Sequence, residues 1–378
     1  MSDYRFFTTN ISTGKVLGDN LPITAQSLQR QINGPGTGTV SLNLLSGNPE
    51  LNAANLAAVQ PRKSLLWCLQ DGAIIWNGVI WDWNHQSILD GTLPLGCATL
   101  ESVMAHRVID NTFTYTDMDI FDMFRNLVEY AITKTPNGYI PGLNYMSGES
   151  GITDTVTFDG TQYQLVSDAL TTLVQTYEIE YTFMPYQSSR SGDWCTMVML
   201  GYPYLGQSFP ESGLVYSFPG NVTDYGFQAT GSTSANFVYA TASDTAGSSS
   251  TTLSGTAVDL VDLDAGYPLS EMAVTANVVN WTSNTQVANF AQGYLPQVTD
   301  TQLTPLLTVP GDIYPKISQV VLGSSAQITL TSALHPAGPD GTPGFSGTGR
   351  VTGWTLMPPG PDQPESAQIL IGDMTLTP

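Results

Sequence analysis

The amino-acid sequence predicts a mainly β protein with α+β insertions, and three observations lead to this fold class. Its 378 residues include 36 Gly and 24 Pro, which suit a chain with many turns. Only 11% of the residues are charged, so the polar surface must come largely from Ser, Thr, Asn, Gln and Gly. Short apolar or alternating runs bounded by turn residues recur toward both ends of the chain, while helical spacing is limited to three stretches between them.

The strongest local signal is a tryptophan-rich hairpin at residues 65–83. Two apolar runs flank Asp71-Gly72, a dipeptide that tolerates the two positive φ angles of a tight turn. A two-residue turn sets a register in which Gln70 faces Ala73 and Trp67 faces Trp76. One predicted face carries Trp67, Leu69, Ile74, Trp76 and Ile80, and the other carries Cys68, Ile75, Val79 and Trp81.

Both faces of this hairpin are apolar, so neither is expected to lie at a free surface. We expect one face to pack in a core and the other to meet a second layer or another subunit. The candidates for this core or interface role are Trp67, Trp76, Trp81 and Trp83.

The segments around the hairpin predict a first β-domain that ends near Arg107. Strands are expected at residues 4–9, 27–32, 39–45 and 92–101, and residues 47–61 are expected to form a short helical turn or a loop.

Helical spacing begins after Thr116, which is the expected N-cap of the first helix. Pro136-Asn137-Gly138 should end this helix. Three carboxylates near its start, Asp117, Asp119 and Asp122, could suggest a metal or acid–base site. Their position at the positive end of the helix dipole explains them more simply. A second helix is expected at residues 162–176, followed by strands at 177–184 and 194–200.

From residue 214 the chain returns to strand patterns. Strands are predicted at residues 214–218, 236–242, 304–309, 327–332, 349–356 and 368–376. Residues 243–256 are rich in Ser, Thr, Gly and Ala, and we expect a mobile loop there. A third helix at 284–295 should bury Val287, Phe290 and Leu295 on one side.

The charge balance limits the choice of partners. The chain carries 32 acidic and 11 basic residues, for a net charge of −21, and no Lys or Arg lies between Arg190 and Lys316. A protein of this kind should not bind nucleic acid tightly, because phosphate binding needs clustered cations. It could still let nucleic acid pass without holding it. Simple solubility is the other explanation of the acid excess.

No motif indicates an enzyme, a cofactor or a metal site. The three histidines, His85, His106 and His335, lie in no catalytic pattern, and the segment from Asp262 to Gly266 departs from a calcium loop. Cys68, Cys97 and Cys195 have neither metal-ligand nor redox spacing and are expected to be free buried thiols.

Targeting signals are not evident either. We see no signal-peptide pattern and no stretch long enough to span a membrane, and we expect the chain to fold in a cytoplasm.

A series of short stretches, taken in order, resembles a known group of proteins. The stretches are Tyr4-Arg5-Phe6-Phe7, Gln31-Ile32-Asn33-Gly34-Pro35-Gly36, the Asp71-Gly72 hairpin, Asp122-x-x-Arg125, Gly201-Tyr202-Pro203, Tyr216-x-Phe218-Pro219-Gly220-Asn221, Asp264-Ala265-Gly266-Tyr267-Pro268-Leu269 and Gly349-Arg350-Val351-Thr352-Gly353. The series is similar to the minor tail proteins of long-tailed (siphovirus-type) phages of actinobacteria. Within these it resembles the central tail hub, which is related in fold to the baseplate hub of contractile-tailed phages.

This resemblance implies two tail-tube-like β-barrel domains. Residues 1–107 would form the first barrel, and residues 213–242 with 300–378 the second. Residues 108–212 would form an α+β peripheral domain, and residues 243–299 a peripheral insertion with one helix. Three copies would then place six barrels in a ring.

The resemblance also implies a location and partners. The chain would be a non-enzymatic virion protein of the tail tip, without cofactor or membrane insertion. As a homotrimer it would join the distal tail protein ring to receptor-binding or other minor tail proteins. It would enclose the channel for the tape measure protein and for DNA ejection. The acid excess of the sequence then predicts a lumen wall that is neutral or net negative.

A carbohydrate-binding or glycan-cleaving tail protein acting on the host cell envelope is the alternative. The four hairpin tryptophans would then form a sugar-stacking groove, and two facing carboxylates would cleave the glycan.

Overall fold

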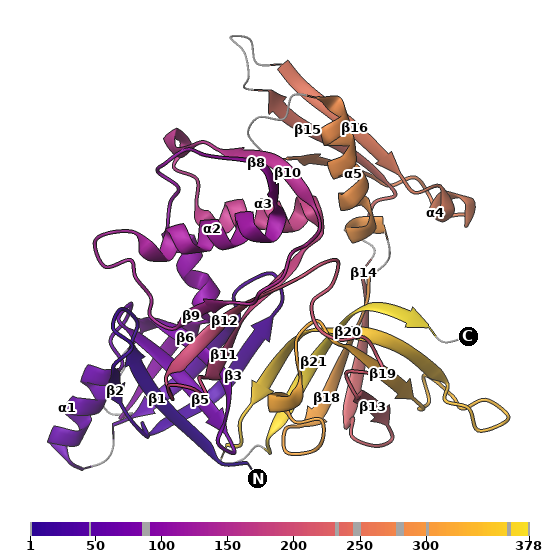
Figure 1. Ribbon diagram of the computed structural model, residues 1–378. Coiled ribbons are helices and arrows are strands. Elements are labelled where there is room, and N and C mark those ends of the chain that lie inside the picture. The colour runs from indigo at the N-terminus through magenta and orange to yellow at the C-terminus, as the bar shows by residue number, and fades with distance from the viewer. Residues whose placement is uncertain are drawn as a thin grey trace.

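The largest element of the fold is an antiparallel sheet of 13 strands with one parallel pair, β13 and β19. The computed structural model (Figure 1) describes residues 2–44, 47–84, 91–230, 234–244, 251–276, 283–299, 302–360 and 364–376. The main path of the sheet is β14-β18-β21-β20-β3-β4-β7-β6-β5-β1-β2. Off this path β19 pairs with β20, and β13 pairs with the other edge of β19. The mainly β class predicted from the sequence is confirmed.

The sheet has two halves that meet where β20 pairs with β3. The N-terminal half contains β1 (Tyr4–Asn10), β2 (Val16–Gly18), β3 (Ile23–Gln31), β4 (Thr37–Asn43), β5 (Ser64–Gln70), β6 (Ala73–Trp83) and β7 (Thr92–Ala98). The C-terminal half contains β13 (Leu214–Phe218), β14 (Asp224–Thr230), β18 (Gln302–Pro310), β19 (Ser325–Leu330), β20 (Phe345–Met357) and β21 (Ser366–Leu376). Within the described residues no strand pair closes either half into a barrel, so the two barrels stay a prediction.

The hairpin of β5 and β6 forms around Asp71-Gly72, and both turn residues have positive φ angles. Its register agrees with the prediction only near the turn, where Gln70 faces Ala73. Beyond Leu69 a β-bulge inserts Ile75, so Cys68 faces Trp76. The predicted pairing of Trp67 with Trp76 is therefore wrong, because one extra residue moves all later side chains of β6 to the other face.

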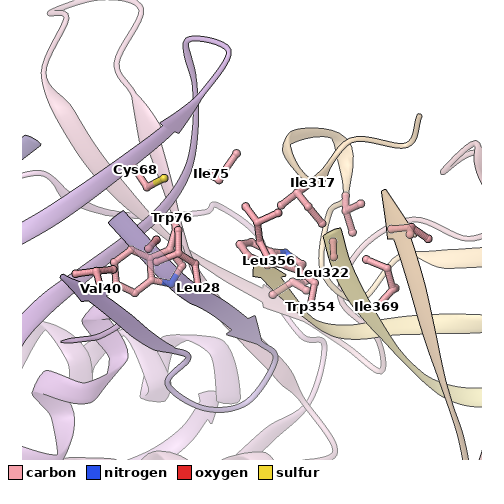
Figure 2. Close-up of a cluster of buried hydrophobic side chains, with 14 of the residues drawn as sticks. Leu28, Val40, Cys68, Ile75, Trp76, Ile317, Leu322, Trp354, Leu356 and Ile369 are labelled. Atoms are coloured by element: carbon pink, nitrogen blue, oxygen red, sulfur yellow. The ribbon is translucent and has the colours of Figure 1, made fainter. Parts of the chain in front are cut away.

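The bulge sends the two tryptophans into different cores. Trp76 belongs to a sheet core shared by both halves, where Leu28 and Val40 meet Trp354 and Leu356 (Figure 2). Trp67 belongs to a second core, the layer core, together with Leu65, Leu69 and Val79 of the hairpin. The second layer that the apolar hairpin requires is thus supplied by the same chain.

That layer is an α+β unit, which Figure 1 shows above the N-terminal half. It contains β8 (Phe113–Asp119), α2 (Ile120–Thr133), β9 (Leu143–Tyr145), β10 (Thr153–Phe158), α3 (Val166–Tyr177), β11 (Glu180–Gln187) and β12 (Trp194–Gly201). Two short 3-10 turns, Leu100–His106 and Gly160–Gln162, precede β8 and α3. The apolar faces of α2 and α3 pack into the layer core.

The predicted start of the first helix is wrong. Thr116 lies inside β8, because that strand continues to Asp119 by pairing with β10. Asp119 is the N-cap of α2, and its carboxylate accepts a hydrogen bond from the amide of Phe121 at 2.9 Å. Strand pairing therefore moves the cap three residues beyond the predicted Thr116.

A smaller unit lies at the upper right of Figure 1. It contains β15 (Phe237–Asp244), β16 (Thr251–Val258), α4 (Leu260–Asp264), β17 (Glu271–Thr275) and α5 (Asn284–Thr299). The predicted loop over 243–256 is wrong at residues 243–244 and from residue 251, because β15 continues to Asp244 and pairs with β16 along its whole length. Residues 245–250 lie outside the described residues. Val287, Phe290 and Leu295 of α5 are buried, as predicted.

Three further features complete the fold. A helix, α1 (Pro49–Ala58), occupies the stretch predicted as a helical turn or a loop, and a 3-10 turn at Ile317–Gln319 follows β18. Cys68, Cys97 and Cys195 are free and buried, as expected. Among the described helices none has the length and apolar character needed to cross a membrane.

Candidate functional site

The four hairpin tryptophans do not gather at one site. Trp67 and Trp76 are buried in the two cores, whereas Trp81 is half-buried and Trp83 is 37% exposed. The indole of Trp67 donates to Thr9 Oγ1 at 2.9 Å, and the indole of Trp76 donates to the carbonyl of Gln29 at 2.9 Å. This dispersal removes the four-residue sugar platform considered from the sequence.

Trp76 fills a tight slot between two glycines. A Cβ atom at Gly78 would lie 2.2 Å from the indole ring, and one at Gly38 would lie 2.7 Å from it. Both distances are shorter than any van der Waals contact, so the ring and the two glycines form one packing unit. This places Trp76 in a structural role.

An open groove of about 1480 Å³ lies between the edge of β6–β7 and the segment after α2. Its lining includes residues of β4 and β7, the stretch from Pro61 to Lys63, and the loop from Pro136 to Gly138. Only Trp81 of the four tryptophans reaches it. The indole of Trp81 donates to Ser102 Oγ at 2.8 Å, and its ring lies 4.2 Å from the ring of His106.

The groove concentrates positive charge in an otherwise acidic protein. Four of the eleven Lys and Arg residues line it, namely Arg62, Lys63, Arg107 and Lys134. We call this surface the basic groove and define it by these four residues and His106. Asp82 is the only acidic residue among its described lining residues.

The basic groove is short of acidic partners. Lys134 Nζ lies 3.0 Å from Asp110 Oδ1, but no carboxylate of the described chain pairs with Arg62, Lys63 or Arg107. Partial burial lowers the pKa of Arg107, and the nearby charge of Arg62 lowers this pKa further. The cost of holding these like charges together would fall if an anionic group entered the groove.

Sequence reasoning did not find this groove. Its cations come from three separate places in the chain, near residues 62, 107 and 134, and only folding brings them together. The adjacent Arg62-Lys63 pair was the available signal, because adjacent cations are unusual in a chain with eleven of them.

The buried charges serve to join parts of the fold. The guanidinium of Arg350 on β20 forms a two-pronged ion pair with the carboxylate of Glu180 on β11, including a 2.7 Å contact from Nη1 to Oε1. Arg30 of β3 donates to the carbonyl of Phe183 at 3.0 Å. Glu101 accepts from the amide of Phe183 at 2.8 Å, and burial raises its pKa. These contacts tie the α+β layer to both halves of the sheet.

The candidate metal and catalytic residues named from the sequence do not form a site within the described residues. Within the described residues no group of three or more His, Cys, Asp or Glu side chains is placed to hold a metal ion. Of the three carboxylates near the start of α2, Asp119 caps the helix and Asp122 pairs with Arg125. Asp259 caps α4, so the segment compared with a calcium loop begins as a short helix.

Comparisons with known proteins concern the fold alone. No protein-family model matches the chain, and no curated protein matches it. A tail protein from Neisseria meningitidis MC58 has a similar structure, with a TM-score of 0.62 and 11% identity over 98% of this chain and 96% of that one. The 43 kDa tail protein of prophage MuSo2 from Shewanella oneidensis gives a TM-score of 0.57 and 10% identity, over 97% of this chain and 98% of that one.

A third similar structure is prophage tail protein gp18 from Listeria monocytogenes EGD-e. Its TM-score is 0.53 and its identity 9%, over 98% of this chain and 94% of that one. These three structural neighbours are all tail proteins, two of them from prophages, and the likeness extends over nearly the whole length of this chain.

Proposed function

We propose that this chain is a structural protein of a phage tail tip, and more specifically the central tail hub. Three copies would form a ring that joins the distal tail protein ring to receptor-binding or other minor tail proteins. The ring would enclose the channel through which the tape measure protein and DNA leave the particle.

The observation that carries the proposal is the extent of the fold likeness. Three tail proteins, two of them from prophages, share the fold over 97% or more of this chain, so the likeness takes in both halves of the sheet, the α+β layer and the small upper unit. A catalytic domain would show a site of convergent polar groups. In the described residues, buried ionisable side chains instead form contacts that join parts of the fold.

In the proposed ring the two halves of the sheet line the wall. Residues 1–107 and residues 213–236 with 300–378 would each supply one barrel-like unit, so three copies would match the sixfold symmetry of a tube. Residues 108–212 and the small upper unit, which begins with β15 at Phe237, would lie at the periphery. Because the chain has a net charge of −21, we expect acidic residues to outnumber Lys and Arg on the wall. Such a wall would let DNA pass without the salt-dependent binding that contacts between cations and phosphates produce.

Light scattering and negative-stain images of the purified protein test the proposal. We expect a trimer at tens of micromolar and particles with threefold symmetry and a central hole. A monomer at that concentration, together with phage tails whose tip lacks a threefold ring of this chain, would contradict it. Soluble binding of cell-wall glycan by a monomer would favour the carbohydrate-binding alternative.

A further inference from the structure

Three of the four cations of the basic groove have no carboxylate partner within the described chain, and the chain carries an element whose chemistry matches them. This element is α4 with the turn that follows, residues 259–271, which we call the acidic tip. It carries four acids and no Lys or Arg. The acids are Asp259, Asp262, Asp264 and Glu271.

The acidic tip also exposes large apolar side chains. Val261 is 79% exposed, and Leu260, Tyr267 and Leu269 are each more than half exposed. A short helix that holds so much apolar surface in water is typical of an element that docks on another surface. The basic groove offers partly exposed apolar side chains of its own, including Ile11, Trp81 and Val108.

The two surfaces lie on different parts of the molecule. In Figure 1, α4 is at the right-hand edge, whereas β6 and α2, which lead into the groove, lie to the left. A ring of identical copies closes through head-to-tail contacts, and these need two different, complementary patches on one chain. Cations with apolar side chains on one side, and acids with apolar side chains on the other, meet that requirement.

We propose that the basic groove of one subunit receives the acidic tip of a second copy of this chain. This inference rests on the proposed trimeric ring and names the contact that closes it. At about 1480 Å³ the groove exceeds the roughly 300–1,000 Å³ of ordinary small-molecule sites, and its open form suits a polypeptide segment. Asp264 and Glu271 would pair with Arg62 and Lys63, while Val261 would cover the apolar lining.

Zero-length cross-linking tests the contact directly. Equal amounts of ¹⁴N- and ¹⁵N-labelled protein are assembled together and treated with a carbodiimide, which joins a lysine Nζ to a carboxylate in contact with it. We expect mixed-isotope peptides that link Lys63 or Lys134 to residues 259–271. A trimer whose inter-subunit links all lie elsewhere would overturn the inference and leave the proposed function standing.

Charge reversal tests the energetics. The double substitution Arg62→Glu/Lys63→Glu should raise the concentration at which trimers form by at least tenfold at low salt, and by less at about 0.5 M salt. Adding Asp264→Lys/Glu271→Lys to the same chain should restore assembly, because the reversed pairs again attract. Lys15→Glu/Arg190→Glu is the matched control, since both cations are exposed and lie outside the groove lining, and it should leave assembly unchanged.

The outcomes separate the two proposals. The circular dichroism spectrum and the melting temperature of each variant monomer are measured to check that the exposed substitutions preserve the fold. The groove variant could form trimers as well as the control does and yet no longer bind another tail protein. In that case the groove binds that protein, and the second-copy assignment is wrong. If wild-type protein forms no trimer in solution or in tails, the proposed function itself fails.

Discussion

The two halves of the large sheet bury their strands in different ways. All seven residues of β5 in the N-terminal half are buried, because one face lies in the sheet core and the other in the layer core. In the C-terminal half β19 alternates between buried and half-buried residues, and none of the described residues of that half belongs to the layer core. Strands covered on both faces are continuously apolar, whereas strands covered on one face alternate. The comparison teaches that the α+β layer, rather than strand pairing, distinguishes the halves.

Replacing Trp76 should have the largest effect, because this side chain lies in the core that both halves share. Trp76→Ala should lower the free energy of unfolding by about 3–5 kcal/mol in urea denaturation. Trp83→Ala at the exposed end of the same strand is the control and should change it by less than about 0.5 kcal/mol. Equal effects of the two substitutions would mean that the shared core does not hold the halves together.

Breaking the ion pair between the layer and the C-terminal half should rank second. Glu180→Gln leaves the buried guanidinium of Arg350 facing a neutral amide, at a cost of about 3 kcal/mol in unfolding free energy. Arg5→Gln disrupts the exposed pair with Asp19 and should cost less than about 1 kcal/mol. If Glu180→Gln unfolds as wild type does, the layer couples to the C-terminal half by other contacts.

Removing the cap of α2 should affect the layer alone. Asp119 accepts hydrogen bonds from Phe121 and from the Ser150–Gly151 turn, so Asp119→Ala should cost about 1–2 kcal/mol. Thr116→Ala, at the cap expected from the sequence, should cost less than about 0.5 kcal/mol. Hydrogen exchange should localise the added opening to α2 and spare the C-terminal half. The reverse ranking would restore Thr116 as the cap.

The smallest effect is a pH dependence at the boundary between the layer and the N-terminal half. Burial raises the pKa of Glu101 above its ordinary value of 4.5, so the folded state favours the neutral acid. Its contribution to stability is therefore fully present below pH 4.5 and is lost as the pH rises through the folded-state pKa. The stability of wild type relative to Glu101→Gln should fall over this range in denaturation curves. A difference that does not change with pH would contradict the shift.

Several features of the fold could be predicted from the sequence. The positive φ angles at Asp71-Gly72 and the burial of Val287, Phe290 and Leu295 followed from local residue preferences. Cover on both faces of the hairpin, by a core and by a second layer or another subunit, also followed, because the hairpin was apolar on both faces. The basic groove was out of reach, because Arg62, Arg107 and Lys134 are far apart in the chain.

The sequence by itself determined features that depend on neighbouring residues. These are the turn of the hairpin, the positions of most strands, the end of α2 before Pro136 and the acid excess. Their causes act within a few residues through φ preferences, side-chain periodicity and helix termination.

Only the tertiary structure decided which side chains share a face or a site. The bulge at Ile75 separates Trp67 from Trp76, pairing with β10 moves the cap of α2 to Asp119, and packing with β15 makes a strand of residues 251–258. Each of these outcomes depends on segments distant in the chain, whose contacts outweigh local preferences. For the same physical reason, the groove cations and the Arg350–Glu180 pair come together only in the folded protein.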